Sequence, residues 1–352
     1  MSTASRRGRI ASIAVCALIA NAGMVCARPC SRVSLDRALS EATLIVTGSL
    51  VSTVHPSIPG GDSKSVIRID RVLKGEMQRP LVEVTHFLCG MDYDYVFQEG
   101  RRFIAFIDAY GNLVGGTAVF PASSQSAPKQ RDTRGAVRAE LQWALGDTDT
   151  RIARTALGAL GELDGRAAVP VLERYRTAAD FGIRFRALSL LIRFGDADAL
   201  DEVARIVSAA PFTREFPQSW FYNEKEEPLM TAYDDLRAAL GSYGGQNFDG
   251  STAPDHVTER FVEGVGRLAQ VNNRMIRREA IHALRGLNRR VSFPILAAAL
   301  DDPDEHVRYD SMFTLCMAMG APDLRCPATF LFEKDEQRYI NRVRMWWSTQ
   351  KP

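Results

Sequence analysis

The chain has 352 residues and carries 44 Lys and Arg against 42 Asp and Glu, which gives a formal net charge of +2. A charge balance this close to neutral offers no general electrostatic case for nucleic acid, so we expect no nucleic-acid partner. The length predicts about two domains.

The N-terminus predicts an export signal. Arg6, Arg7 and Arg9 precede an apolar run over residues 10–20 that is too short to cross a bilayer, and residues 25–27 suit cleavage. We therefore predict a signal peptide over 1–27 and a periplasmic or secreted product. The alternative is an uncleaved N-terminal segment that tethers the chain to a membrane. We expect no integral membrane segment after cleavage.

Cleavage after residue 27 leaves four cysteines, and an even number in an oxidising compartment favours disulfides. Three pairings are possible. The one that links near elements within each half joins Cys30 to Cys89 and Cys316 to Cys326. Free buried thiols are the alternative. No C-x-x-C pair supports a redox motif or a zinc ribbon.

The first half of the chain alternates polar and apolar residues with a period of two. After a short helical stretch over 34–42, five segments show this pattern or a continuous apolar run, at 43–54, 65–73, 81–88, 101–108 and 112–120. Five short strands in so few residues suit a small closed barrel better than an open sheet. We predict this domain over residues 28–122, followed by a polar, Ser- and Pro-rich linker over 123–135.

The second half repeats itself. Helical segments align on Ile152, Ile183, Ile276 and Val307, with spacings of 31, 93 and 31 residues. A helix pair of this length hides its apolar face only by stacking on its neighbours, so we predict an α-solenoid over 136–325. Residues 211–250 break the pattern. Either degenerate repeats fill this interval, or an insertion projects from the solenoid.

Two groups of residues are candidate partner-binding sites. The interrupted interval contains Trp220, Phe221 and Tyr222, which either form a contact surface or fold back to fill a gap between repeats. The repeat near residue 280 concentrates basic residues that would suit an anionic partner surface: Arg274, Arg277, Arg278 and Arg285. The alternative is a solvated helix face whose arginines pair with nearby acids such as Glu279, Asp301, Asp302 and Asp304.

Residues 326–352 predict a C-terminal capping helix. Tyr339, Val343, Trp346 and Trp347 would form one broad apolar stripe that packs back on the array. Docking onto a partner or a membrane surface is the alternative.

Catalytic and metal motifs are missing from the sequence. The five histidines are scattered and show no ligand spacing, so we predict no catalytic residue, no metal and no cofactor. Because Ser-His-Asp groups assemble from distant positions, a hydrolase with dispersed catalytic residues stays an alternative.

Two family resemblances add to this interpretation. The 31-residue units, with "DPDEHVR" and "GELDGRAAVPVL", resemble short bacterial HEAT-like repeats of the kind found in phycobilin lyase subunits. Such arrays are commonly binding scaffolds, so the resemblance implies a protein partner. It does not extend to lyase activity, because no pigment-binding signature is present.

The first half resembles the netrin-like, or tissue-inhibitor-of-metalloproteinases, type of OB-fold. The resemblance rests on a cysteine near the mature start, on "RVLKGE" at 71–76, on Cys89-Gly90 and on "EGRRFIAF" at 99–106. It implies an OB-like barrel in which Cys30 tethers the N-terminal segment to Cys89. It also implies an alternative function, a metalloprotease inhibitor acting through the N-terminal ridge. That chemistry requires a free amine on the first cysteine, whereas Arg28 and Pro29 precede Cys30.

The sequence therefore predicts a multidomain α+β protein, with a small five-stranded OB-like barrel followed by an α-solenoid of HEAT-like helix pairs. We expect an exported, non-enzymatic scaffold that binds a protein partner.

Overall fold

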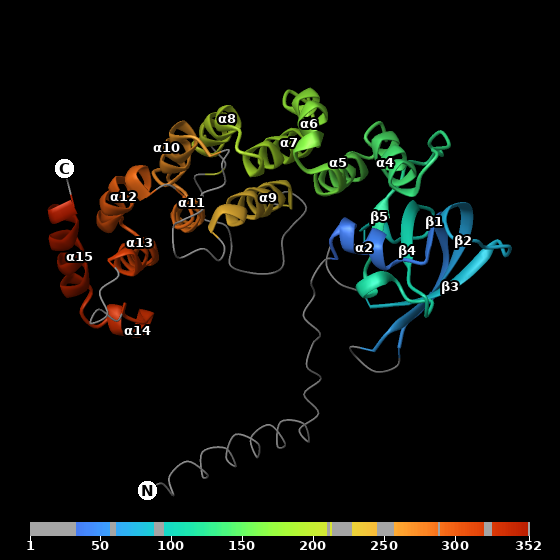
Figure 1. The fold of residues 1–352 in the computed structure, drawn as a ribbon, viewed down its shortest axis with the longest axis horizontal. Coiled ribbons are helices and arrows are strands. Elements are labelled where there is room, and N and C mark those ends of the chain that lie inside the picture. Colours follow the sequence, from blue (N-terminus) through green and yellow to red (C-terminus); the bar gives the residue numbers. More distant parts are fainter. Residues whose placement is uncertain are drawn as a thin grey trace, which may run out of the picture. The chain divides into compact units, whose positions relative to one another are not determined.

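The computed structural model describes residues 33–56, 61–87, 95–209, 212, 227–244, 257–287, 289–319 and 326–350. The chain is a multidomain α+β protein, as predicted, with a sheet in the N-terminal part and helices in the C-terminal part (Figure 1). It divides into two compact units, residues 1–147 and 148–352, which are called here the first and the second unit.

The first unit contains one five-stranded sheet in which all strand pairs are antiparallel. Its strand order is β3-β2-β1-β4-β5. The strands are β1 (Leu44–Val54), β2 (Ser63–Lys74), β3 (Leu81–His86), β4 (Arg102–Ile107) and β5 (Val119–Pro121). The buried faces of these strands meet in one apolar core that includes Val46, Ile67 and Phe103. Alternate residues at the start of β2 are buried, as the sequence alternation predicts, whereas β4 and the first half of β1 are buried over consecutive residues.

The outer edge of β3 is hydrogen-bonded to the segment that connects β4 with β5. Thr85 donates its N–H to the carbonyl of Gly111 at 3.1 Å and accepts from Leu113 at 2.9 Å, and Phe87 donates to Gly116 at 3.2 Å. The Thr85–Asn112 bridge is parallel. The two ends of the sheet order are therefore linked through residues 111–116.

The strand predicted over 112–120 is wrong in part, because the 3₁₀ helix η1 (Val114–Gly116) interrupts it and β5 is short. Gly115 and Gly116 have φ values of 56° and 80°, which L side chains rarely adopt. A Cβ atom at Gly116 would lie 2.0 Å from Phe87 Cε1, so only glycine lets the Phe87 ring cover this turn.

The "RVLKGE" motif holds the short helix α2 (Leu35–Glu41) against the sheet. Lys74 Nζ donates to the carbonyls of Leu39 (3.1 Å) and Ala42 (2.5 Å) at the C-terminal end of α2, where a cation is favourable. Gly75 has a φ of 80°, and a Cβ there would lie 2.6 Å from the Thr43 carbonyl oxygen. The motif is thus a joint between α2 and β2.

Helix α4 (Thr133–Ala144) belongs to the first unit, although the second domain was predicted to begin at residue 136. The buried carboxylate of Glu140 on α4 accepts hydrogen bonds from Arg102 at 2.8 Å and from Arg71 at 3.5 Å. The predicted linker is also bound to the sheet, since Arg102 donates to the carbonyls of Ser123 and Gln125. The boundary between the units falls after Asp147.

The second unit is built of helices that pack on one another in two series (Figure 1). In one series α5 packs on α7, α7 on α9, α9 on α11, α11 on α13 and α13 on α15. In the other, α8 packs on α10 and α10 on α12. The helices are α5 (Thr150–Asp164), α6 (Val169–Tyr175), α7 (Phe181–Arg193), α8 (Ala197–Val207), α9 (Glu227–Gly244), α10 (Glu259–Leu268), α11 (Arg274–Leu284), α12 (Arg289–Ala298), α13 (Glu305–Ala318), α14 (Thr329–Phe332) and α15 (Glu336–Gln350).

The sequence repeat corresponds to a repeated helix start. The four aligned residues at 152, 183, 276 and 307 are buried, and each lies three positions after the residue that caps its helix. The side chain of each cap accepts a hydrogen bond from a backbone N–H of the first turn, which satisfies a donor that the helix itself leaves free. These caps are Asp149, Asp180, Asn273 and Asp304.

Within the 93-residue interval, the described residues between α8 and α11 form α9 and α10. Helix α9 packs on both α7 and α11 and so occupies the place of a repeat helix. Arg186 of α7 pairs with Asp235 of α9, and Tyr233 of α9 donates to Glu279 of α11 at 3.0 Å. Residues 213–226 and 245–256 lie outside the described part of the chain, so both alternatives stay open.

The C-terminal helix α15 packs on α13 and buries Ile340 and Val343. The rings of Trp346 and Trp347 each lie 6.0 Å from the Phe293 ring of α12. A disulfide joins Cys316, in the last turn of α13, to Cys326. Residues 1–32 and 88–94 lie outside the described part of the chain, and with them the predicted signal peptide and the predicted Cys30–Cys89 pair.

Candidate partner-binding surface

Arg277, one of the predicted partner-binding residues, is buried with 7% of its surface exposed. Its guanidinium donates to both carboxylate oxygens of Asp302, at 2.8 and 2.9 Å. It also donates to the carbonyls of Val271 at 3.0 Å and Asn272 at 2.8 Å. Arg277 thus ties α11 to the turns on both sides and is not available to an anionic partner, which corrects the prediction for this residue.

The same interaction recurs in other repeats. Arg184 and Arg308 occupy the position that corresponds to Arg277, one residue after the aligned apolar residue. Like Arg277, each donates to the carbonyl six residues earlier, Arg184 to Ala178 at 3.1 Å and Arg308 to Asp302 at 2.8 Å. The arginine at this position therefore fastens α7, α11 and α13 to the turns that precede them, whereas α5 has Ala153 there.

Arg278 and Arg285 meet at the buried carboxylate of Asp310 on α13. Arg278 Nε lies 3.0 Å and Arg285 Nη2 3.2 Å from it, and His282 Nε2 lies 2.9 Å away. Burial alone would raise the pKa of Asp310, but the hydrogen bonds and charges of His282 and Arg278 hold it below its usual value. These side chains join α11 to α13.

Arg274 has the longest ion pair of the four predicted arginines. Its Nη1 lies 3.5 Å from Asp304 Oδ2, and its side chain is 35% exposed. All four arginines therefore have acidic partners on the turn before α13 or on α13 itself, and they do not form a free basic patch. The aromatic residues 220–222 lie outside the described residues.

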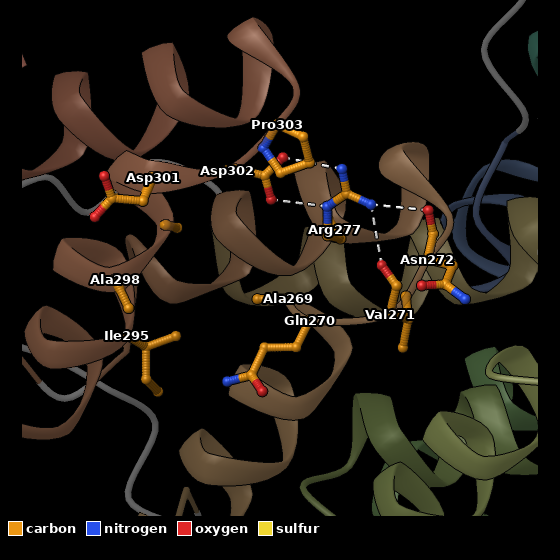
Figure 2. A pocket seen from close by; sticks show the side chains of 11 residues that line it. Ala269, Gln270, Val271, Asn272, Arg277, Ile295, Ala298, Asp301, Asp302 and Pro303 are labelled. Atoms are coloured by element: carbon orange, nitrogen blue, oxygen red, sulfur yellow. Dashed lines mark hydrogen bonds and ion pairs between the residues drawn. The ribbon is translucent and has the colours of Figure 1, made fainter.

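The structure shows a groove that the sequence did not suggest, between the C-terminal ends of α10 and α12 (Figure 2). Its volume is about 500 Å³. In Figure 2, Ile295 and Ala298 face Ala269 and Gln270 across the groove, and the Arg277–Asp302 pair lies at one end. The walls carry small aliphatic side chains and the amides of Gln270 and Asn272.

Glycines on α10 set the spacing of the neighbouring helices. A Cβ atom at Gly266 would lie 2.7 Å from Ile295 Cδ1 of α12, and one at Gly264 would lie 3.1 Å from Leu200 Cβ of α8. The glycines let α8 and α12 approach α10 closely, so the groove lies beside tightly packed helices. The pattern Gly-x-Gly within a helix is the sequence signal that could have indicated this close packing.

A second, shallower groove lies between α8 and α10 and has a volume of about 720 Å³. Arg260 and Arg267 of α10 both pair with Asp201 of α8 in this groove. Burial raises the pKa of Asp201, and the two guanidinium groups, Arg267 first, outweigh burial and lower it. Arg205, which also lines the groove, is exposed. Grooves therefore flank α10 on both sides.

The described residues contain no group of three or more His, Cys, Asp or Glu side chains that could hold a metal ion. In the same part of the chain, every helix is too short or too polar to span a bilayer.

No protein-family model matches the chain, and no curated protein matches it. One solved structure with some similarity is the crystal structure of an engineered protein. The alignment covers 53% of this chain and 72% of the engineered protein, with 14% sequence identity and a TM-score of 0.25. A likeness this weak carries no conclusion about fold or function.

Proposed function

We propose that the protein is an exported, non-enzymatic scaffold that binds a protein partner through a HEAT-like solenoid formed by its second unit, with an OB-like barrel as an accessory domain. The observation that carries this proposal is the pair of grooves beside α10, which lie on a series of helices that pack one after another.

Three features support the solenoid. Each repeat helix starts with an Asp or Asn cap three residues before a buried apolar residue. The arginine that follows fastens the helix to the preceding turn in three repeats. Within each of the two series, the helices pack in chain order, so each repeat contacts its neighbours, as in a quasi-one-dimensional array.

The hydrogen bonds of the first unit support the OB-like barrel. Strand β1 pairs with both β2 and β4. Thr85 of β3 forms a parallel bridge with Asn112, which follows β4 in the chain. With residues 112–113 counted as the start of the fifth strand, the sheet returns to its own edge, as a small five-stranded Greek-key barrel does.

The groove between α10 and α12 is suited to a side chain of a partner protein. Its lining consists of three alanines, aliphatic and amide side chains, a proline and an arginine–aspartate pair whose charges already neutralise each other, together with Asp301, which pairs with Arg344. Methyl walls bury an apolar side chain favourably, and Gln270 offers a hydrogen-bond donor and acceptor at the rim. The lining contains no histidine, cysteine, serine or lysine that would serve as a nucleophile or a base.

The test is affinity capture of native envelope proteins on the full-length chain, quantified by mass spectrometry. Ala298→Arg places a long cation in the groove, where Ala298 is exposed and lines the wall. The matched control is Ala238→Arg, which makes the same change at an exposed alanine on α9, outside both grooves.

We expect recovery of a specific partner to fall at least about tenfold with Ala298→Arg, equivalent to the roughly 1.4 kcal/mol of one lost anchor contact, and to stay unchanged with Ala238→Arg. Equal recovery by both variants and the unchanged chain would contradict binding through this groove. A partner that is retained by residues 33–147 alone would place binding on the first unit instead.

A further inference from the structure

His86, at the end of β3, is buried inside the first unit with 1% of its surface exposed. Its Nε2 lies 2.7 Å from Ser65 Oγ of β2, and Ser65 Oγ lies 2.7 Å from Thr53 Oγ1 of β1. The imidazole and two hydroxyl groups thus form a polar chain across three neighbouring strands, which lie side by side in Figure 1.

The other side of the imidazole faces the apolar core. The ring lies 5.0 Å from the Phe97 ring in an edge arrangement, and Phe97 lies 4.9 Å from Phe103. Phe97 and Phe103 both belong to the buried cluster of the sheet. A positive charge on His86 would therefore be placed between hydroxyl groups and phenyl rings, away from water, which is unfavourable.

Among the described residues, the charged groups that act on His86 are His55 and Asp62, both of which are exposed. Lys64 and Glu83 pair with each other at 3.3 Å, and Arg101 stacks on the Tyr95 ring at 3.9 Å. Burial first, and then the charge of His55, lower the pKa of His86 to about 4, although the charge of Asp62 opposes this shift.

We propose that His86 is an acid-sensitive lock on the first unit, whose protonation opens the sheet at the end where β1, β2 and β3 meet. The hydrogen bonds released on opening include those that join Thr85 to Leu113 and Phe87 to Gly116 at the outer edge of β3. Opening would therefore expose an unpaired strand edge.

The direction of the effect follows from the two states of the histidine. When the sheet is open, His86 is in water and binds a proton near pH 6.5, whereas in the closed sheet it does so only near pH 4. Above pH 6.5 neither state binds the proton, so closure carries no penalty. As the pH falls from 6.5 to 4, the ratio of open to closed forms rises by up to about tenfold per pH unit.

The buried carboxylate cluster on α13, in the described part of the second unit, is expected to respond to acid only at a lower pH. Asp310 of this cluster has a pKa below the usual 3.8, so its stabilising contacts with Arg278 and His282 stay intact until the pH falls below that value. Acid should consequently open the first unit while the helices of the second stay folded.

Amide hydrogen exchange of the full chain between pH 7.5 and 4.5, corrected for the intrinsic pH dependence of exchange, tests the lock. We expect protection of the amides in 63–70 and 81–86 to fall by about tenfold per pH unit below pH 6. Amides of α7 should keep their protection. Unchanged protection in β2 and β3 would overturn the proposal.

Two histidine variants separate the lock from general acid sensitivity. His86→Gln cannot be charged and should remove the pH dependence in β2 and β3, and His306→Gln, at a half-exposed histidine of the second unit, should leave it unchanged. The same fall in protection in His86→Gln would overturn the proposal.

If that variant does not fold, an NMR titration of the imidazoles in the unchanged chain decides. One histidine should stay neutral above pH 5, and titration of all five near pH 6 or above would overturn the lock.

Discussion

Arg102 in the first unit and Arg277 in the second are both inward-facing arginines with several partners, yet they hold different kinds of structure. Arg102 connects β4 to Thr47 on β1, to the segment at 123–125 and to Glu140 on α4. Arg277 connects α11 to carbonyls five and six residues earlier and to Asp302. The contacts of Arg102 thus join segments that are distant in the sequence, whereas the bond from Arg277 to the carbonyl six residues earlier recurs at Arg184 and Arg308.

This difference determines how far the loss of one contact should destabilise each unit. Loss of a contact that joins distant segments should destabilise the whole first unit, because its sheet, α4 and the bound segment at 122–127 belong to one compact unit and are joined by hydrogen bonds. Loss of one recurring contact in the second unit should weaken mainly the two repeats that it joins.

The largest effect is expected at Glu140. Its side chain is fully buried between Arg71 and Arg102, so Glu140→Ala removes the carboxylate that these two guanidinium groups share and should lower the free energy of unfolding of the first unit by about 3–5 kcal/mol. Urea unfolding followed by the exchange of β-strand amides measures this. Arg134→Ala on the same helix removes an exposed pair with Asp36 and should cost less than about 1 kcal/mol. Equal costs would refute the assignment of α4 to the first unit.

A smaller and more local effect is expected from Arg277→Lys. Lysine keeps the charge but loses the two-pronged contact with Asp302 and the bonds to two carbonyls, so we expect a loss of about 1.5–3 kcal/mol. Hydrogen exchange should show the loss in α11 to α13, with α7 little changed. Arg274→Lys, at a half-buried arginine of the same helix whose ion pair with Asp304 is longer at 3.5 Å, is the control and should lie within about 0.5 kcal/mol of the unchanged chain. A loss spread evenly over all helices would contradict a repeat-by-repeat structure.

The Cys316–Cys326 disulfide closes a short loop and should contribute about 2–3 kcal/mol by restricting the unfolded chain. The double variant Cys316→Ala, Cys326→Ala should show this loss in thermal unfolding of the second unit. A reducing agent should destabilise the C-terminal helices of the unchanged chain and not those of the double variant. Identical responses to the reducing agent would show that this disulfide contributes nothing.

The smallest effect is expected at the helix caps. Asp180→Ala removes the acceptor for the N–H of Ile183 and should cost about 1 kcal/mol, detectable as faster exchange in the first turn of α7. Asp180→Asn keeps an acceptor and should recover most of the loss. If Asp180→Ala is neutral, the repeated Asp is not the start signal of the helices.

The same contrast explains how much the sequence could predict. The repeat helices were located because each carries its own start signal, such as Asp180 before Ile183 or Asp304 before Val307. Strands β1 to β4 were located because the pattern of apolar residues along a strand is also a local property, and they lie within the predicted segments apart from a few end residues. The fifth segment was located only in part, because η1 interrupts it.

Contacts between distant residues could not be predicted from such local signals. Nothing near Glu140 in the sequence indicates that its partners are Arg71 and Arg102, so α4 was assigned to the wrong side of the boundary. The basic residues of α11 were noted, but which of them face acids depends on Asp302 and Asp310, which lie one repeat later. The groove beside α10 depends on how closely Gly266 lets Ile295 approach, which only the packed helices show.

The most direct test of the proposed scaffold is site-specific photo-crosslinking in native envelopes, with the photoreactive residue placed at Ala298 in the groove or at Ala238 on α9. The proposal predicts a discrete adduct with a partner protein from Ala298 that is competed by excess unlabelled chain, and no such adduct from Ala238. Equal adducts from both positions, or an adduct only from an exposed position of the first unit such as Tyr110, would contradict it.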